Sequence, residues 1–178
     1  MAEIFHLSEF RDHNALQMGY RPWHLRFGQN FSRNTRLADL CPETLNQLAE
    51  PGDDSANLIN ALIIGFLEFG ENLVFGALES RDQSRVLDIH LFLADQIRFE
   101  MMWRLGWLST YSGNQYPLFA MVRQFDEVQK ACQDQPPQLA ANHPGFAEYR
   151  NLVHRDQQVF IRRMLPSALK AFKDSYQP

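Results

Sequence analysis

The sequence contains few cysteines and lacks the spacings that bind zinc. Its two cysteines, Cys41 and Cys132, lie far apart, and none of the six histidines forms a zinc-binding pattern with them. These spacings exclude a standard structural zinc site and give no disulfide framework. The chain also has no GxSxG nucleophile motif, and its glycines form no phosphate-binding loop between a strand and a helix. We therefore expect no cofactor.

An excess of positive charge is also missing. The formal net charge is −4, so bulk electrostatics favour neither nucleic acid nor an anionic membrane. Binding of a polyanion would need a local basic patch. The first residues, MAEIFHLSEFRDH, are too acidic and too interrupted for a signal peptide. We therefore expect a cytoplasmic protein with reduced thiols.

The sequence has no long hydrophobic run without charge. Its most apolar segment, LINALIIGFLEFGENLVFGAL at 58–78, contains Glu68 and Glu71. A carboxylate at the centre of a bilayer costs roughly 2.5–3.5 kcal/mol, which argues against a membrane span. We expect instead a buried helix over 55–80, at the centre of the fold or at the seam of a homodimer. The three glycines of this segment, Gly65, Gly70 and Gly76, indicate close approach by another helix or a ligand, and we favour a helix.

The hydrophobic pattern has a helical period and no convincing strand alternation. It predicts a short helix near 40–50 and long helices over 55–80, 84–108, 117–133 and 146–175. Proline-rich residues 134–145 separate the last two helices, and we expect a kink at Pro166. Together these elements predict an all-α single domain, a helical bundle of about four long helices and one short helix (41–178) after an irregular N-terminal arm (1–40).

Two carboxylates on the predicted central helix raise the hypothesis of a metal or cofactor site. Glu68 and Glu71 share a polar stripe with Asn57, Asn60 and Glu79. Di-metal carboxylate bundles use Glu-x-x-His motifs on two of their helices, and this sequence has none. We therefore interpret the stripe as a solvent-exposed face and rank a metal or cofactor site lower.

His90 is a further candidate for ligation or catalysis. It lies on the apolar face of the predicted helix 84–108, together with Leu93 and Ile97. A buried imidazole tends to be neutral, and it acts as a ligand, as a base or as a hydrogen-bonded structural group. Because buried polar groups are normally hydrogen-bonded, we favour the structural role.

Residues 148–154, EYRNLVH, place an arginine and a histidine close together. This motif resembles the catalytic motif of HEPN ribonucleases, which are all-helical proteins that cleave RNA. In that family the arginine polarises the phosphate and the histidine transfers the proton. The resemblance implies catalytic roles for Arg150 and His154, although the family separates the two by four to six residues and here three intervene. Arg85 and His90, in RVLDIH, have four residues between them but no polar residue after the arginine.

The end of the N-terminal arm combines basic and aromatic residues. Residues 19–40 contain Arg21, Arg26, Arg33 and Arg36 together with Trp23, Phe27 and Phe31. Such a mixture suits phosphate or nucleic-acid binding. The three aromatic residues are also spaced as one helical stripe, which would dock the arm on the bundle. We favour docking, because large aromatic side chains are usually buried.

The sequence favours a non-catalytic binding or regulatory module over an enzyme. RNA cleavage by Arg150 with His154, or by Arg85 with His90, is the alternative, and a metal or cofactor carrier built on His90, Glu68 and Glu71 ranks lower. We expect a protein or small molecule as partner, with homodimerisation through helix 55–80 as one arrangement. Nucleic acid is a less favoured partner, and we expect no membrane partner.

Overall fold

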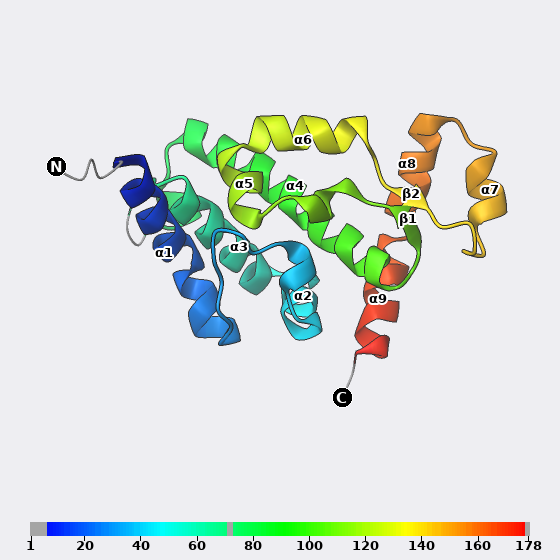
Figure 1. Ribbon diagram of the computed structural model, residues 1–178, viewed down its shortest axis with the longest axis horizontal. Helices are drawn as coiled ribbons and strands as arrows, with labels where there is room; N and C mark the ends of the chain where they lie inside the picture. Colours follow the sequence, from blue (N-terminus) through cyan, green and yellow to red (C-terminus); the bar gives the residue numbers. More distant parts are fainter. Residues whose placement is uncertain (1–6, 71–72, 177–178) are drawn as a thin grey trace, which may run out of the picture.

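The computed structural model describes residues 7–70 and 73–176. These residues form an all-α fold with one short two-stranded sheet, which confirms the predicted class (Figure 1). The helices are α1 (Leu7–Phe27), α2 (Pro42–Ala49), α3 (Asp53–Phe66), α4 (Ser80–Arg104), α5 (Leu118–Arg123), α6 (Phe125–Asp134), α7 (Phe146–Arg150), α8 (His154–Arg163) and α9 (Leu165–Ser175). Strands β1 (Leu108–Thr110) and β2 (Gln138–Leu139) pair antiparallel. Three one-turn helices are η1 (Leu37–Asp39), η2 (Phe75–Ala77) and η3 (Ser112–Gln115).

Helices α3 and α4 form the centre of the core. Helix α3 packs against α1, α2, α4 and α5, and α4 also contacts α2 and α9. Along α4 the buried apolar side chains follow a helical period, at Val86, Ile89, Leu93, Ile97 and Met101. Fully burying one such side chain stabilises the fold by roughly 1.5–3 kcal/mol. Although the core is apolar, every helix across residues 7–70 and 73–176 falls short of the length or hydrophobicity that a bilayer span requires.

Helix α3 ends at Phe66, so the prediction of one helix over 55–80 is wrong. Glu68 has a positive φ of 57°, and the hydrogen bonds around it follow the Schellman pattern that closes a helix. Arg123 donates to the Phe66 carbonyl at 2.9 Å, which satisfies a carbonyl without a helical partner. Glycine usually occupies the position that Glu68 fills, so the helix end lacked its usual sequence signal.

The helix crossing predicted from the glycines occurs at Gly65. Helices α1 and α3 cross in close contact there, and a Cβ atom on Gly65 would overlap the backbone of Gly19. Gly70 has another reason to be glycine, because its φ of 143° is one that other residues rarely adopt. A Cβ atom on Gly76 would meet no atom within 4 Å. Only Gly65, of these three glycines, marks a helix crossing.

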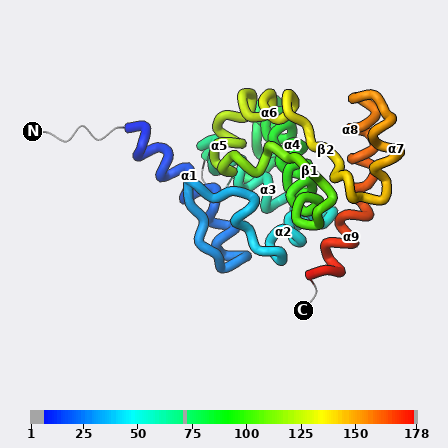
Figure 2. Tube along the Cα trace, turned by 45° about the vertical axis from the view of Figure 1, so that its right-hand side comes forward, coloured from blue at the N-terminus to red at the C-terminus, as the bar shows by residue number. Residues whose placement is uncertain are grey.

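The N-terminal arm predicted as irregular contains the 21-residue helix α1, so that part of the prediction is wrong. Pro22 lies inside α1, where its missing N–H removes one hydrogen bond of the helix. The C-terminal half of α1 packs on α3, where the buried Trp23 donates its indole N–H to the Leu58 carbonyl at 2.9 Å. Tyr20 stacks on Phe31, with 5.1 Å between ring centroids. Figure 2 shows the N-terminal turns of α1 extending beyond the rest of the molecule.

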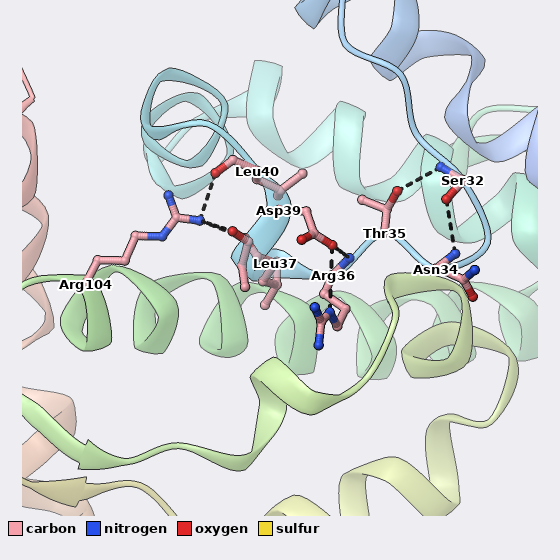
Figure 3. A network of polar contacts seen from close by, with 9 residues as sticks. Ser32, Asn34, Thr35, Arg36, Leu37, Asp39, Leu40 and Arg104 are labelled. Atoms are coloured by element: carbon pink, nitrogen blue, oxygen red, sulfur yellow. Dashed lines mark hydrogen bonds and ion pairs between the residues drawn. The ribbon is translucent and has the colours of Figure 1, made fainter.

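The segment between α1 and α2 is irregular apart from η1, and α4 holds it in place. Arg104, at the end of α4, donates to the carbonyls of Leu37 at 2.9 Å and Leu40 at 2.8 Å (Figure 3). The same guanidinium pairs with the buried Glu100 at 2.9 Å. Arg104 therefore binds backbone carbonyls of the segment and ties it to the core.

The last two predicted helices are interrupted. Residues 117–133 fall into α5 and α6, with a break at Gln124, where φ is −116° and ψ is 39°. Residues 146–175 fall into α7, α8 and α9. Met164 ends α8 and precedes α9, so Pro166 lies in the first turn of α9, where proline is well tolerated. The expected kink is therefore a break, and several shorter helices replace the predicted long ones.

Candidate functional site

A groove of about 660 Å³ lies between α4, α6 and α8 and opens to solvent. Its floor is buried and largely aromatic, and consists of Phe92, Phe99, Tyr111, Phe125 and Cys132. Its walls are polar, and include Arg85, Asp88, Asp95, Asp126, Gln129, Gln133, His154, Gln158 and Arg162. An apolar floor with a few polar groups around it is typical of a ligand-binding site. We call this site the α4–α6–α8 groove.

Each of the three helices presents one face to the groove. The face of α4 repeats at helical spacing, through Asp88, Leu91, Phe92, Asp95, Gln96 and Phe99. On α6 the corresponding residues are Phe125, Gln129 and Cys132, and on α8 they are His154, Gln158 and Arg162. Side chains three and four residues apart share a helix face, so each helix contributes a row of groups to the same space.

Two ion pairs cross the groove between helices. Arg85 of α4 binds Asp126 of α6 at 3.2 Å, and its guanidinium lies 5.3 Å from the centroid of the Phe125 ring. Arg162 of α8 binds Asp95 of α4 at 2.7 Å. Exposed ion pairs contribute little to stability, so these two are weak links between the helices that form the walls.

One edge of the groove combines exposed leucines with an aspartate that is unpaired in the described part of the chain. Leu91 is 58% exposed, and Leu87, one turn earlier on α4, is 49% exposed. Asp88 lies between them in sequence and makes no hydrogen bond or ion pair with any residue in the described ranges. This edge therefore leaves apolar surface and one uncompensated carboxylate facing solvent.

The buried polar groups of the floor hold their protons at neutral pH. Burial raises the pKa of the Cys132 thiol, and the nearby Ser112 hydroxyl offsets this only in part. Burial also raises the pKa of Tyr111, whose hydroxyl donates to the Gln96 carbonyl at 3.0 Å. A protonated thiol is a poor nucleophile. The Cys132 thiol is therefore not an activated nucleophile.

The structure does not bring Arg150 and His154 into one cavity. Arg150 ends α7 and His154 begins α8, with a turn between the two helices. Arg150 lines a separate cavity of about 330 Å³ with Tyr149 and Gln157. His154 lines the α4–α6–α8 groove. The helix break directs the two side chains into different spaces.

Arg85 and His90 also point in different directions. Arg85 lines the groove, whereas His90 faces α3, with its Nδ1 2.8 Å from the Asn60 side-chain oxygen. Partial burial lowers the pKa of His90, and the positive charge of Arg98 lowers it further. A neutral imidazole that donates from Nδ1 to this oxygen connects α4 to α3. This geometry agrees with a structural role for His90, whose hydrogen-bond partner is the side-chain amide of Asn60.

Two of the candidate metal ligands, Glu68 and His90, bind other side chains. The Glu68 carboxylate accepts from Arg123 at 3.1 Å, so it is engaged in an ion pair at the end of α3. Glu71 lies outside the described residues. His90 is bound to Asn60. Throughout residues 7–70 and 73–176, no group of three histidines, cysteines or carboxylates could hold a metal ion.

The N-terminal arginines mostly face acidic residues, and the tryptophan among them is buried. Three form ion pairs with carboxylates of the same chain: Arg26 with Asp54 at 2.6 Å, Arg33 with Asp12 at 2.9 Å, and Arg36 with Asp39 at 3.8 Å. Arg21 lines a small cavity of about 160 Å³ between α1 and α3. Trp23 packs in the core, so it presents no surface on which a base could stack. This region is therefore docked on the bundle, and its arginines form no concentrated basic patch.

Sequence reasoning missed most of the groove. It identified Arg85 and His154, but assigned them to two different pairs. Asp88, Asp95 and Arg162 carry no local motif, because their shared position depends on how three distant helices pack. The one available signal was the four-residue repeat of His154, Gln158 and Arg162, which marks a polar face of α8.

No protein-family model matches the chain, and no curated protein and no solved structure matches it either. The groove must therefore be interpreted from its own geometry and chemistry.

Proposed function

We propose that this protein is a non-catalytic binding module, and that its α4–α6–α8 groove receives an amphipathic helix of a partner protein. The observation that carries this proposal is the buried aromatic floor of an open groove, bordered by the exposed Leu87 and Leu91. Grooves between helices commonly bind an amphipathic helix through apolar residues at i, i+3, i+4 and i+7.

The exposed leucines favour a protein segment over a small molecule. A small molecule on the aromatic floor would leave Leu87 in water, since this residue lies one turn beyond the lining residue Leu91. A helix laid along the groove would cover both side chains. Covering each half-exposed leucine contributes roughly 1 kcal/mol to binding.

Charge complementarity indicates a basic residue on the partner helix. The groove is lined by three aspartates and two arginines, and two of the aspartates are paired with the arginines. Asp88 remains without a partner among residues 7–70 and 73–176. A lysine or arginine beside the apolar face of the partner would neutralise it and help to fix its orientation.

The other hypotheses have less support. RNA cleavage requires an arginine and a histidine at one scissile phosphate, and Arg150 and His154 line different cavities. A homodimer through residues 55–80 would need an exposed apolar seam, whereas α3 buries Ile59, Leu62 and Ile63 inside its own chain. Sedimentation velocity tests the oligomeric state independently of the groove.

The proposal is tested with a displayed library of amphipathic helical peptides that carry leucine or phenylalanine on one face and lysine or arginine beside it. Peptides enriched on the wild-type protein are then measured against three variants by fluorescence anisotropy. Leu91→Asp places a charge at the apolar edge, and Asp88→Asn removes the carboxylate. Leu25→Asp is the matched control, because Leu25 is 82% exposed at the end of α1.

We expect enriched peptides to lose about tenfold or more in affinity with Leu91→Asp, equivalent to about 1.4 kcal/mol. Asp88→Asn should weaken the peptides that bear a basic residue, and Leu25→Asp should leave affinity unchanged. Failure to enrich any peptide would contradict the proposal. Equal binding to wild type and Leu91→Asp would also contradict it, because the peptide would then occupy another surface.

A further inference from the structure

A second pocket, of about 520 Å³, lies beside the α4–α6–α8 groove. It is formed where the end of α4 meets β1, η3 and the connection from α6 to β2, and we call it the Trp103 pocket. Its lining is Trp103, Ser109, Thr110, Tyr111, Ser112, Asn114, Gln115, Asp134, Gln135, Pro136 and Gln138. The two cavities are neighbours, because they share the lining residues Tyr111, Ser112 and Pro136. Their other lining residues differ.

The polar groups of the Trp103 pocket are almost all uncharged. Its lining contains four side-chain amides (Asn114, Gln115, Gln135 and Gln138) and the hydroxyls of Ser109, Thr110, Tyr111 and Ser112. Among the described residues, Asp134 is its single carboxylate. Within residues 7–70 and 73–176, no lysine, arginine or histidine lines the pocket. A phosphate or carboxylate ligand would therefore meet no cation here and would face the charge of Asp134.

The four side-chain amides are available to a ligand. The Ser109 hydroxyl donates to the Gln138 backbone carbonyl at 3.4 Å, and the Ser112 hydroxyl donates to the Gln135 backbone carbonyl at 3.0 Å. These bonds fix the backbone of the pocket and do not use the amide side chains. In the part of the chain that the structure describes, the amide groups of Asn114, Gln115, Gln135 and Gln138 make no hydrogen bond. Each amide offers two donors and an acceptor, which suits a ligand rich in hydroxyl groups.

Trp103 supplies the apolar wall of the pocket. Its side chain lies in the last turn of α4 and remains 39% exposed, which is unusual for a residue of this size. A pyranose ring has one face of C–H groups and an equator of hydroxyl groups. The C–H face packs on an indole, and the hydroxyls bond to amides and carboxylates placed around it.

We propose that the Trp103 pocket binds a neutral saccharide, as a monosaccharide or disaccharide unit. Trp103 packs against the sugar ring, the amides of Asn114 and Gln115 bind its hydroxyls from η3, and Asp134 accepts a further hydroxyl hydrogen bond. The volume lies within the range of roughly 300–1,000 Å³ that small-ligand sites occupy. The proposal does not rest on the peptide groove, because its principal residues are different.

Saturation-transfer NMR with a defined panel tests this proposal. The neutral probes are glucose, galactose, mannose, N-acetylglucosamine, maltose, cellobiose and lactose, and the charged probes are glucuronate and glucose 6-phosphate. Affinities of the sugars that bind are then measured by calorimetry for wild type, for Trp103→Ala and for the double variant Asn114→Ala with Gln115→Ala. Phe10→Ala, at the exposed end of α1, is the aromatic control.

We expect at least one neutral sugar to bind, with a loss of about tenfold or more in Trp103→Ala and in the double variant. Phe10→Ala and the groove variant Leu91→Asp should bind it as wild type does. If circular dichroism shows that Trp103→Ala does not fold, the double variant tests the proposal instead. We expect the double variant to fold, because Gln115 is exposed and Asn114 lies on the one-turn helix η3. Absence of binding by every neutral probe, preference for the charged probes, or binding unaffected by these substitutions would overturn the proposal.

Discussion

Glu100 is a carboxylate in the core with only half of its hydrogen-bonding capacity used. It is 2% exposed, and one oxygen accepts from Arg104 while the other has no partner among the described residues. Arg104 cannot fully compensate, because it also serves the carbonyls of Leu37 and Leu40 (Figure 3). Burying such a charge is costly even when it is paired.

This arrangement predicts a pH dependence of stability. Burial raises the pKa of Glu100, and the nearby Asp39 acts in the same direction, while Arg104 opposes them. In the window between the ordinary glutamate pKa and the raised value, the folded protein binds more protons than the unfolded chain. The Glu100 contribution to the free energy of unfolding must therefore fall as pH rises through this window.

Urea unfolding of wild type and Glu100→Gln, from mildly acidic to neutral pH, measures this effect. The variant cannot ionise at this position, so its stability relative to wild type should rise with pH. The altered hydrogen bond to Arg104 should also change the free energy of unfolding of the variant by the same amount at every pH. A relative stability that stays flat, or falls as pH rises, would show that Glu100 does not titrate as its burial requires.

At the scale of single elements, the crossing of α1 and α3 depends on two glycines. An alanine usually stabilises a helix by about 1 kcal/mol over glycine. At Gly65 the added methyl group would overlap the backbone of Gly19, which cannot move as a flexible side chain could. We expect Gly65→Ala to lower the free energy of unfolding by about 1–3 kcal/mol, as for an overpacked site.

Gly76→Ala provides the matched control in the same segment of sequence. Its Cβ atom would enter open space in η2, so a small effect on urea unfolding is expected. Equal effects of the two substitutions, or stabilisation by Gly65→Ala, would mean that α1 and α3 do not cross as closely as described.

The helices themselves could be predicted from the sequence better than their ends. The period of apolar residues along α4 shows directly which face is buried, and it placed this helix within a few residues. The end of α3 has no comparable local signal. It depends on Glu68 in a left-handed conformation and on Arg123, which reaches the Phe66 carbonyl from another helix. Such long-range capping is invisible to a local pattern.

The candidate site was harder to predict for the same reason. A spacing of four residues made Arg150 and His154 look like neighbours on one helix, but the turn after Arg150 separates them. Arg85 and His154 come to line one groove although they are distant in sequence. Only the packing of α8 toward α4, with Arg162 bound to Asp95, creates that arrangement.

At the scale of the whole molecule, the groove lies where two parts of the chain meet. Helix α8 lies beside α7 and contacts α9 (Figure 1). It reaches α4 through the ion pair of Arg162 and Asp95. Helix α6 reaches α4 through Asp126 and Arg85. Because exposed ion pairs are weak, we expect the two walls to adjust if the proposed partner helix binds, while the buried aromatic floor stays fixed.

Methyl NMR of the leucines tests the proposed groove most directly. A peptide enriched from the amphipathic library is titrated into protein labelled at its leucine methyl groups. We predict that the methyl signals of Leu87 and Leu91 shift with the same saturation curve, because the bound helix covers both. The signal of Leu25, exposed at the end of α1, should not move. Saturable shifts at Leu25 with none at Leu87 and Leu91 would contradict the assignment of the α4–α6–α8 groove as the binding site.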